Sequence, residues 1–378
     1  MAARTIRLSR SSVGIEEQQA LAEVIADGYL GMGRFTQLLE AELAAYLGGG
    51  REVMCVNTGT AALQLAVQGL GIGAGDEVLV PSLTFVASFQ AISATGARPV
   101  ACDVDAETGF IDAADAGRRI TSRTKAIMPV YYASAAPGLA DIYDLAKRRG
   151  LRVVEDAAHA FGGMRAGYRV GAQGDVVCFS FDGIKNITCG EGGAVVTSDR
   201  QVAQRIQDAR LLGVEKDTEK RYSGQRSWEF DVHDQGWRYH MSNLMAAVGR
   251  VQLHKLPQFA EYRCRLMNRY LEAFANVAGL KMLRLLYADI VPHIFVVRVL
   301  GGRRDALMNH LRRMGIECAF HYKPNHWLSK YKTQYSLPGV ETLAHELLSL
   351  PMQAMLTDEE QQEVVSAVRE FLTGSARA

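Results

Sequence analysis

Lys185 occupies a position that favours a chemical role for its side chain over that of an ordinary solvated surface lysine. It lies in a polar, glycine-rich turn, residues 182–193, directly after the strongly apolar residues 176–179. An ammonium group near a protein core must be desolvated or paired, and both are costly. A lysine at such a position is therefore either a salt-bridge partner or a nucleophile.

An acidic residue ends a second apolar run upstream. Residues 151–154 are mostly apolar, and Glu155 and Asp156 follow them. An acid and a lysine that both leave buried strands suit pyridoxal phosphate. Lys185 would form the Schiff base, and Asp156 would keep the pyridine nitrogen protonated. The alternative for Asp156 is a helix cap, which an isolated acid at a strand end provides about as often.

Other residues are weak indicators of a cofactor site when taken singly, but their order along the chain is informative. The tripeptide Thr58-Gly59-Thr60, between a predicted strand and a helix, is suited to a phosphate or to an ordinary N-cap. Phe85 could stack on an aromatic ring or belong to the core. His159 could touch the phenolic oxygen of the cofactor, and Ser180 its phosphate, or both could be structural. The order phosphate loop, aromatic, acid and lysine is that of fold-type I pyridoxal phosphate enzymes.

The bulk properties indicate a globular protein of ordinary composition. With 378 residues the chain is long enough for two domains. Its net charge of +1, without a long basic run, excludes nucleic acid as the indicated partner. No apolar stretch approaches the ~18–20 residues of a membrane span, and we expect no signal peptide. The six cysteines form no CxxC pair, which predicts reduced thiols, a cytoplasmic protein and no metal site.

The pattern of apolar residues predicts an α/β fold. Short strands alternate with helices between residues 53 and 197, which indicates a mainly parallel sheet covered on both faces. Two helices are expected before it, over residues 16–27 and 35–47. Residues 214–235 are polar and predict an exposed excursion.

The rest of the chain predicts a smaller α+β unit. We expect one helix over residues 241–258 and a separate one over residues 263–275. A strand at 294–299 and two later helices follow. The predicted domains are a cofactor-binding domain over residues 1–255 and a small domain over residues 256–378.

Five segments together resemble the DegT/StrS family of pyridoxal phosphate-dependent nucleotide-sugar aminotransferases. They are residues 57–63, residues 75–88, residues 155–160, the Lys185 segment, and residues 236–247. The similarity runs from about residue 10 to 370. It implies a fold-type I enzyme, in which a mainly parallel seven-stranded sheet lies between helices and a smaller α+β domain follows.

The resemblance also implies roles for single residues. Lys185 would be the Schiff-base lysine and proton shuttle, and Asp156 the partner of the pyridinium nitrogen. The cofactor would also contact Thr58, Gly59, Thr60, Phe85, His159 and Ser180. Asn243 is expected to reach the phosphate of a neighbouring subunit, which makes the working unit a homodimer with shared active sites. The glycine loop around Met32, and His321 and Tyr322, are expected near the sugar nucleotide.

Some positions depart from the family pattern. Family members often read His-Leu-Tyr-Gly where this chain has Tyr131-Tyr132-Ala133-Ser134, and arginine is common at the position of His240. These departures bear on the substrate and leave the cofactor assignment unchanged.

Similarity within the family also suggests a reaction. Lys185-Asn186-Ile187-Thr188 followed by Gly190-Glu191-Gly192-Gly193 is most like members that act at sugar C4. The expected activity is transfer of an amino group from L-glutamate to C4 of a nucleotide-linked 4-keto-6-deoxyhexose, dTDP-linked by preference. The product would be an amino sugar for a polysaccharide, such as lipopolysaccharide O-antigen, or for an antibiotic.

Four alternatives remain open at this point. Two are a C3-acting aminotransferase and a 3-dehydratase of the same family, and Lys185 argues against the dehydratase, in which histidine replaces the lysine. A third is a non-catalytic regulator that kept the fold. The fourth, a nicotinamide-dependent dehydrogenase, would need a glycine fingerprint after the first strand, which the chain lacks.

Overall fold

A seven-stranded sheet forms the centre of the molecule. The computed structural model describes residues 5–374. The strands lie in the order β1-β9-β8-β5-β4-β2-β3, and β9 runs against the other six. The mainly parallel seven-stranded sheet expected from the sequence is therefore confirmed. Its strands are β1 (Glu52–Val56), β2 (Glu77–Pro81), β3 (Arg98–Cys102), β4 (Thr124–Ile127), β5 (Arg152–Asp156), β8 (Val176–Ser180) and β9 (Gly193–Thr197).

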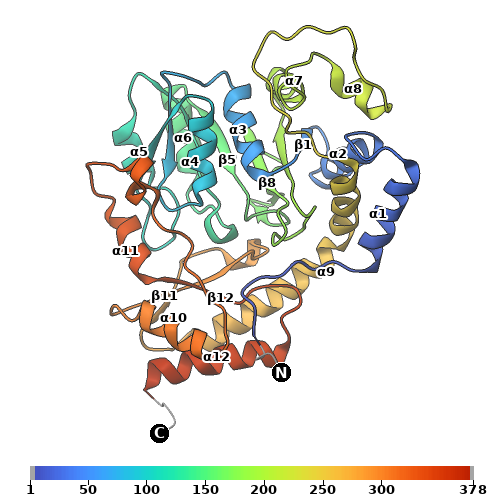
Figure 1. Ribbon diagram of the computed structural model, residues 1–378. Helices are drawn as coiled ribbons and strands as arrows, with labels where there is room; N and C mark the ends of the chain where they lie inside the picture. The colour runs from blue at the N-terminus through green and yellow to red at the C-terminus, as the bar shows by residue number, and fades with distance from the viewer. Residues whose placement is uncertain (1–4, 375–378) are drawn as a thin grey trace.

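Helices cover both faces of this sheet (Figure 1). Successive strand residues point to opposite faces, so Val78 and Val80 belong to one core cluster and Leu79 to another. Three helices pack on the first face: α3 (Gly59–Gly69), α4 (Val86–Ala94) and α7 (Arg200–Ala209). The second face is covered by α1 (Ile15–Asp27), α2 (Arg34–Tyr46), α5 (Ala113–Arg119), α6 (Leu139–Arg149) and the first half of α9 (Asn243–Phe274). Burial on both faces explains why the strands are nearly continuous apolar runs.

The C-terminal part of the chain builds a smaller α+β unit, as the sequence predicts. The antiparallel strands β10 (Leu280–Met282), β11 (Phe295–Val299) and β12 (Leu347–Leu350) form its sheet. This sheet shares a core with α10 (Arg304–Arg313), α12 (Asp358–Thr373) and the second half of α9. The helix α11 (Pro338–Glu346) packs instead on the core of the large sheet. Minor elements are the hairpin β6 (Met164–Arg165) and β7 (Tyr168–Arg169), and the short turns η1 (Tyr132–Ser134), η2 (Tyr287–Asp289), η3 (Asn325–Trp327) and η4 (Ser329–Tyr331).

The prediction of two separate helices over residues 241–258 and 263–275 is wrong. A single helix, α9, runs from Asn243 to Phe274 with Pro257 inside it. A proline within a helix costs roughly 3 kcal/mol. Packing outweighs that cost, because the first half of α9 lies on α1 and α2 while the second half lies in the core of the small unit. The domain boundary predicted after residue 255 falls inside this helix. The division into a large domain over residues 1–255 and a small domain over residues 256–378 remains a proposal.

The polar excursion lies on the outside of the molecule, as expected. Residues 214–235 contain the short helix α8 (Asp217–Tyr222), at the upper right of Figure 1. The Trp228 side chain is 84% exposed. Tyr222 attaches the excursion to the fold, because its hydroxyl donates to Glu40 of α2 and accepts from the buried Arg210 guanidinium.

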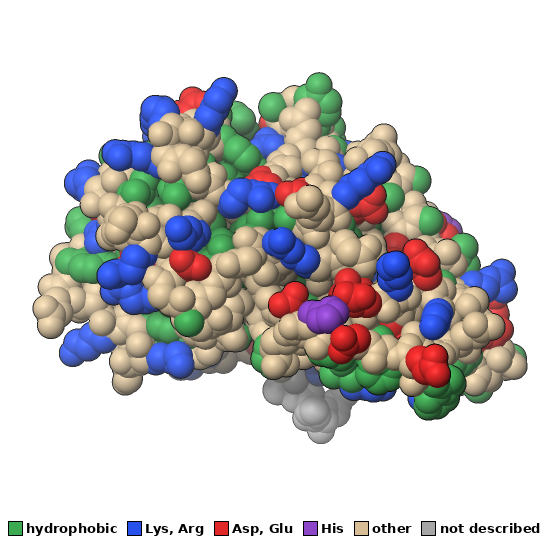
Figure 2. All heavy atoms as spheres, turned by 90° about the horizontal axis from the view of Figure 1, so that it is seen from above, with side chains coloured by type: hydrophobic (Ala, Val, Ile, Leu, Met, Phe, Trp, Pro, Cys, Tyr) green, Lys and Arg blue, Asp and Glu red, His purple; other side chains and the backbone are tan. Residues whose placement is uncertain are grey.

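Several bulk properties agree with the sequence. The six cysteines carry free thiols, and five of them are buried. Basic and acidic side chains are interspersed on the face shown in Figure 2, in keeping with a net charge near zero. None of the helices within residues 5–374 combines the length and apolar character that a membrane crossing requires. The cytoplasm as compartment stays a prediction from the sequence.

Candidate active site

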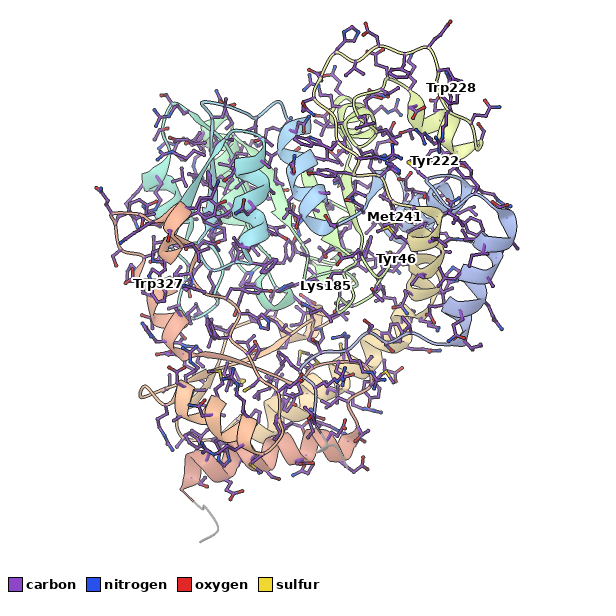
Figure 3. The ribbon with its side chains drawn as sticks, viewed as in Figure 1. Tyr46, Lys185, Tyr222, Trp228, Met241 and Trp327 are labelled. Atoms are coloured by element: carbon purple, nitrogen blue, oxygen red, sulfur yellow. The ribbon has the colours of Figure 1, made fainter. Side chains whose placement is uncertain are left out.

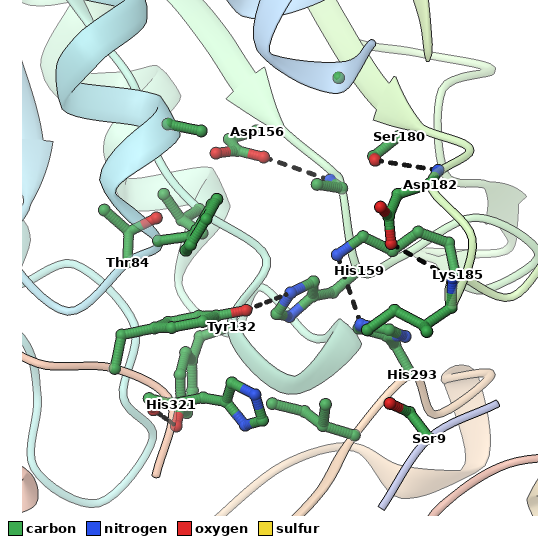
Figure 4. Close-up of a pocket in the computed structure, with 18 of the residues that line it drawn as sticks. Ser9, Thr84, Tyr132, Asp156, His159, Ser180, Asp182, Lys185, His293 and His321 are labelled. Carbon is green, nitrogen blue, oxygen red and sulfur yellow. Dashed lines mark hydrogen bonds between the residues drawn. The ribbon is translucent and has the colours of Figure 1, made fainter. Parts of the chain in front are cut away.

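A cavity of roughly 500 Å³ lies between the large sheet and the small unit. The carboxyl ends of β5 and β8 open into it, and these ends carry Asp156 and Ser180. His321 and Tyr322, between α10 and η3, close it from the other side, while Lys185 reaches in from the turn after β8 (Figures 3 and 4). In an α/β sheet this edge is where ligands bind, because the parallel strands all end there.

The Lys185 amine is held in a largely desolvated place. Its Nζ lies 3.3 Å from Nε2 of His293 (Figure 4). Desolvation lowers the pKa of Lys185 from the ordinary value near 10.5 to about 8, although the carboxylates of Asp182 and Asp156 act in the opposite direction. A substantial fraction of this amine is therefore neutral at mildly alkaline pH, as a nucleophile or base must be.

Asp156 is buried at the end of β5 and is hydrogen-bonded there. Its side chain is 5% exposed, accepts the Ser88 hydroxyl at 2.7 Å and accepts the Ala158 N–H at 3.2 Å. The Ser88 hydroxyl in turn lies 2.8 Å from that of Thr84. Burial raises the pKa of Asp156, and the bond from Ser88 opposes this rise. The arrangement presents a hydrogen-bonded carboxylate to whatever cation enters the cavity.

The N-terminus of α3 offers an anion site beside Ser180. Thr58 is the N-cap of α3, with its hydroxyl accepting the Ala61 N–H at 3.0 Å. Gly59 presses so closely on the end of β8 that an added Cβ would lie 2.7 Å from the Cβ of Ser180. Thr58, Gly59, Thr60 and Ser180 all line the cavity. The N-cap interpretation of Thr58 is therefore confirmed. Exposed amides at a helix start favour a phosphate group, and the phosphate interpretation of Thr58 stays a prediction.

Aromatic and imidazole side chains line the same cavity. Phe85 is 56% exposed, which excludes the core as its place, and its ring centroid lies 5.5 Å from that of Tyr322. The Tyr322 hydroxyl is 3.0 Å from Nε2 of His159. Burial lowers the pKa of His159 well below its usual value, so this imidazole is neutral. His321 is bound to the Ser349 hydroxyl at 2.7 Å, and burial lowers its pKa to about 4.

Two of the predicted site residues lie elsewhere. Asn243 begins α9 with a fully buried side chain that accepts the N–H groups of Phe35 and Thr36 and donates to the carbonyl of Tyr29. The Asn243 amide is therefore hydrogen-bonded within its own chain, and its contact with a phosphate of a neighbouring subunit stays a prediction. Met32 is also fully buried and does not line the cavity formed by the described residues. Its expected place near the sugar nucleotide stays a prediction.

The structure also adds residues that sequence reasoning missed. His293 precedes β11 and meets Lys185 across the domain boundary. No local pattern in residues 290–294 signals this contact. Ser88 lies in a segment that resembles the family, but only the packing of α4 against β5 reveals its bond to Asp156. Asp182 and Glu191 line the cavity as well, on the turn that carries Lys185.

The residues present fit pyridoxal phosphate. The helix start at Thr58 and the Ser180 hydroxyl suit its phosphate, and the buried carboxylate of Asp156 suits a pyridinium nitrogen. Lys185 supplies an amine of lowered pKa in the same cavity. Nδ1 of His159 is buried and has no hydrogen-bond partner within residues 5–374, so its hydrogen-bonding capacity is unused there.

The chain belongs to the DegT/DnrJ/EryC1/StrS aminotransferase family, whose sequence model matches residues 12–369. Members of this family depend on pyridoxal phosphate. The resemblance inferred from the five motifs is thereby confirmed over nearly the whole chain.

Solved structures of similar proteins share the fold. The aminotransferase TlmJ from Streptoalloteichus hindustanus is 34% identical, with a TM-score of 0.91, over 98% of this chain and 100% of that chain. DesV from S. venezuelae is 36% identical, with a TM-score of 0.86, over 96% of this chain and 95% of that chain. Spr1654 from Streptococcus pneumoniae, solved in a PLP form, is 27% identical, with a TM-score of 0.90, over 99% of this chain and 100% of that chain.

Proposed function

We propose that this enzyme transfers an amino group from L-glutamate to a nucleotide-linked keto-sugar with bound pyridoxal phosphate as the carrier. The observation that carries the proposal is Lys185. Its amine of lowered pKa projects into one cavity together with the buried carboxylate of Asp156 and the start of α3. Few functions other than pyridoxal phosphate chemistry need these three features in one place.

The cofactor, when bound, supplies an electron sink that accepts the charge left when the amino acid loses its Cα proton. Asp156 holds a positive charge on the ring nitrogen, because its carboxylate is kept in place by Ser88 and by the Ala158 N–H. Thr58, Gly59, Thr60 and Ser180 bind the phosphate, while Phe85 orients the ring. Lys185 takes the Cα proton on its Nζ and returns one from the same atom, which requires the amine to be neutral first.

The reaction then divides into two half-reactions. L-glutamate leaves as 2-oxoglutarate after giving up its amino group, and the keto-sugar receives that group in the second half. Lys185 moves protons in both halves, so the same amine has to be neutral in one step and protonated in the next. A pKa near 8 allows both states close to neutral pH.

We further propose that the acceptor carbon is C4 of a 4-keto-6-deoxyhexose, carried by dTDP. The support is the similarity of residues 185–193 to C4-acting members of the family. A C3-acting enzyme is the alternative, and the 3-dehydratases are disfavoured because this chain has Lys185. His321 and Tyr322 face the cavity and are proposed to contact the sugar.

We also propose a homodimer with shared active sites. Apolar side chains at Phe85, Ile184 and Leu212 are 39–56% exposed in the single chain. Two of these residues, Phe85 and Ile184, line the cavity itself. A second copy seated over the cavity mouth would cover them.

Borohydride reduction followed by peptide mass mapping tests the cofactor site. A pyridoxyl adduct is expected on Lys185, and Lys185→Ala is expected to lose it together with transamination. Lys147→Ala, on the exposed side of α6, is the matched control and should keep both. An adduct at another residue would overturn the site.

A panel of sugar nucleotides tests the acceptor. Protein loaded with L-glutamate should aminate a dTDP-4-keto-6-deoxyhexose, detected by mass spectrometry with the carbon identified by NMR. A product aminated at C3 would favour the alternative, and failure with every 4-keto-sugar nucleotide would refute the C4 proposal.

A further inference from the structure

His293 lies against the amine of Lys185 although 108 residues separate them. Its side chain is 4% exposed, and its ring lies 4.5 Å, between centroids, from that of His159. We infer that His293 is a positioning residue: its Nε2 holds the Nζ of Lys185 whenever that amine is free, and Ser134 fixes His293 in this place. The inference rests on the proposed function, because an amine that is released and recaptured needs a fixed resting position.

Buried hydrogen bonds tie the His293 segment to two distant elements. The Arg263 guanidinium, from α9, donates to the carbonyls of Pro292 and His293 at 3.2 and 3.4 Å. The Asn186 amide, next to Lys185 in the chain, donates to the carbonyl of Val291 at 2.9 Å. The turn that carries Lys185 and the segment that carries His293 are therefore linked by the Asn186 side chain and by the contact between Lys185 and His293.

Ser134 supplies the third link, in an unfavourable backbone conformation. Its φ is 73°, a region that residues with a side chain seldom adopt. Its hydroxyl donates to the His159 carbonyl at 2.5 Å and accepts the N–H of His293 at 2.9 Å. One hydroxyl thus joins the backbones of both histidines that flank Lys185. Its neighbour Ala133 also has a positive φ, of 48°, but has no side-chain donor or acceptor.

The direction of the contact follows from the chemistry of the two groups. An ammonium group has three N–H donors and no lone pair, so Nε2 of His293 must accept from protonated Lys185 and carry its own proton on Nδ1. Burial and the nearby lysine lower the pKa of His293 far below its usual value, so the imidazole does not compete for the proton. The other titratable groups that act on the Lys185 amine are Asp156, Asp182, His159 and His321.

The geometry gives His293 a specific task. Accepting one N–H of Lys185 fixes where Nζ rests and leaves its other hydrogens directed toward the cavity. Fixed placement of a proton donor matters because proton transfer requires heavy atoms at hydrogen-bond distance. In this proposal His293 acts through its contact with Lys185 and does not itself exchange a proton with the substrate.

The test compares two variants of His293 whose side-chain amides differ in length. In His293→Gln a side-chain polar atom can occupy the place of Nε2, while in His293→Asn it reaches only the place of Nδ1, which has no partner within the described residues. The readout is the pKa of the Lys185 amine. It is obtained from the pH dependence of reductive methylation, followed by peptide mass spectrometry, in protein treated with L-glutamate to free the amine.

The expected results follow from loss of the acceptor. His293→Phe should lower the pKa of Lys185 by about one pH unit, because its ammonium loses a hydrogen-bond partner. His293→Asn should do the same, and His293→Gln should restore most of the original value. Ser134→Gly should shift the pKa in the same direction by a smaller amount, whereas Ala133→Gly, the matched control, should leave it unchanged.

An unchanged pKa in His293→Phe, or equal values in the Gln and Asn variants, would overturn the inference. If the Phe variant does not fold, the comparison of Gln with Asn decides alone. The methylation readout does not depend on sugar amination. A missing borohydride adduct on Lys185 would therefore refute the proposed function without deciding the role of His293.

Discussion

Removing the Ser88 hydroxyl should weaken the hold of Asp156 on a positive charge in the cavity. In the structure this hydroxyl donates to the Asp156 carboxylate at 2.7 Å, in a site where the carboxylate is 5% exposed. A hydrogen bond to a charged group contributes ~1.5–3 kcal/mol. Since ~1.4 kcal/mol corresponds to one pH unit, Ser88→Ala should raise the pKa of Asp156 by about one to two pH units.

The assay is the half-reaction with L-glutamate, followed by the change in cofactor absorbance. A carboxyl whose pKa is raised is ionised only at higher pH, so the acidic limb of the pH–rate profile should move upward in Ser88→Ala. The rate at pH 7 should fall by about tenfold, equivalent to ~1.4 kcal/mol of transition-state stabilisation. Ser88→Thr keeps a hydroxyl and should restore most of the rate.

Ser93→Ala is the matched control. Ser93 lies on the same helix, α4, and its hydroxyl donates to the Phe89 carbonyl at 2.9 Å rather than to Asp156. Its removal should leave both rate and pH profile unchanged. The reasoning is refuted if Ser88→Ala has the same acidic limb as Ser93→Ala and a rate within twofold of that control. The Ser88 hydroxyl would then not affect the ionisation of Asp156.

Three more outcomes are expected. Because the pKa of Lys185 is near 8, the half-reaction rate should rise with pH by about tenfold per unit up to that value and then level off, as measured by stopped-flow absorbance. Gly59→Ala should weaken cofactor binding, measured by fluorescence titration, since its Cβ would lie 2.7 Å from the Cβ of Ser180. Glu40→Gln should reduce the free energy of unfolding in urea by ~3 kcal/mol, because it leaves the fully buried Arg210 without its carboxylate at 2.5 Å.

Each of these outcomes has a control and a contrary result. A rate that keeps rising to pH 10 would mean that the Lys185 amine is not desolvated. Gly117→Ala, in ordinary contact with its surroundings, should bind cofactor normally, and equal loss in both glycine variants would contradict the close approach at Gly59. Asp358→Asn removes an exposed carboxylate paired with Arg269 and should change stability little. A similar loss in Glu40→Gln and Asp358→Asn would show that burial of Arg210 is not the cause.

Much of the candidate site could be predicted from local sequence because its parts lie at strand ends. Asp156 and Ser180 end apolar runs, and Lys185 follows the second of them. Parallel strands present their carboxyl ends at one edge of a sheet, so residues far apart in the chain meet there without any specific long-range signal. The same regularity predicted the sheet itself, since alternating strands and helices can bury their apolar faces in few ways.

Other features depend on packing between distant parts of the chain. The amide of Asn243 is used to hold residues 29–36, more than 200 positions away, and no pattern around Asn243 indicates it. The helix α9 continues through Pro257 because both of its halves are buried against other elements. The sequence taken alone favoured a core position for Phe85 over contact with a ligand, and only its exposure of 56% in the folded chain excludes the core.

The sequence by itself indicated the chemistry that we propose for this protein: a lysine and an acid at neighbouring strand ends, with a helix start suited to a phosphate, in a fold that brings strand ends together. Only the tertiary structure decided what tunes that chemistry. The lowered pKa of Lys185, the bond from Ser88 to Asp156 and the contact with His293 all depend on burial and on contacts across 68 to 108 residues. Side-chain desolvation is a property of the packed chain, and no local pattern records it.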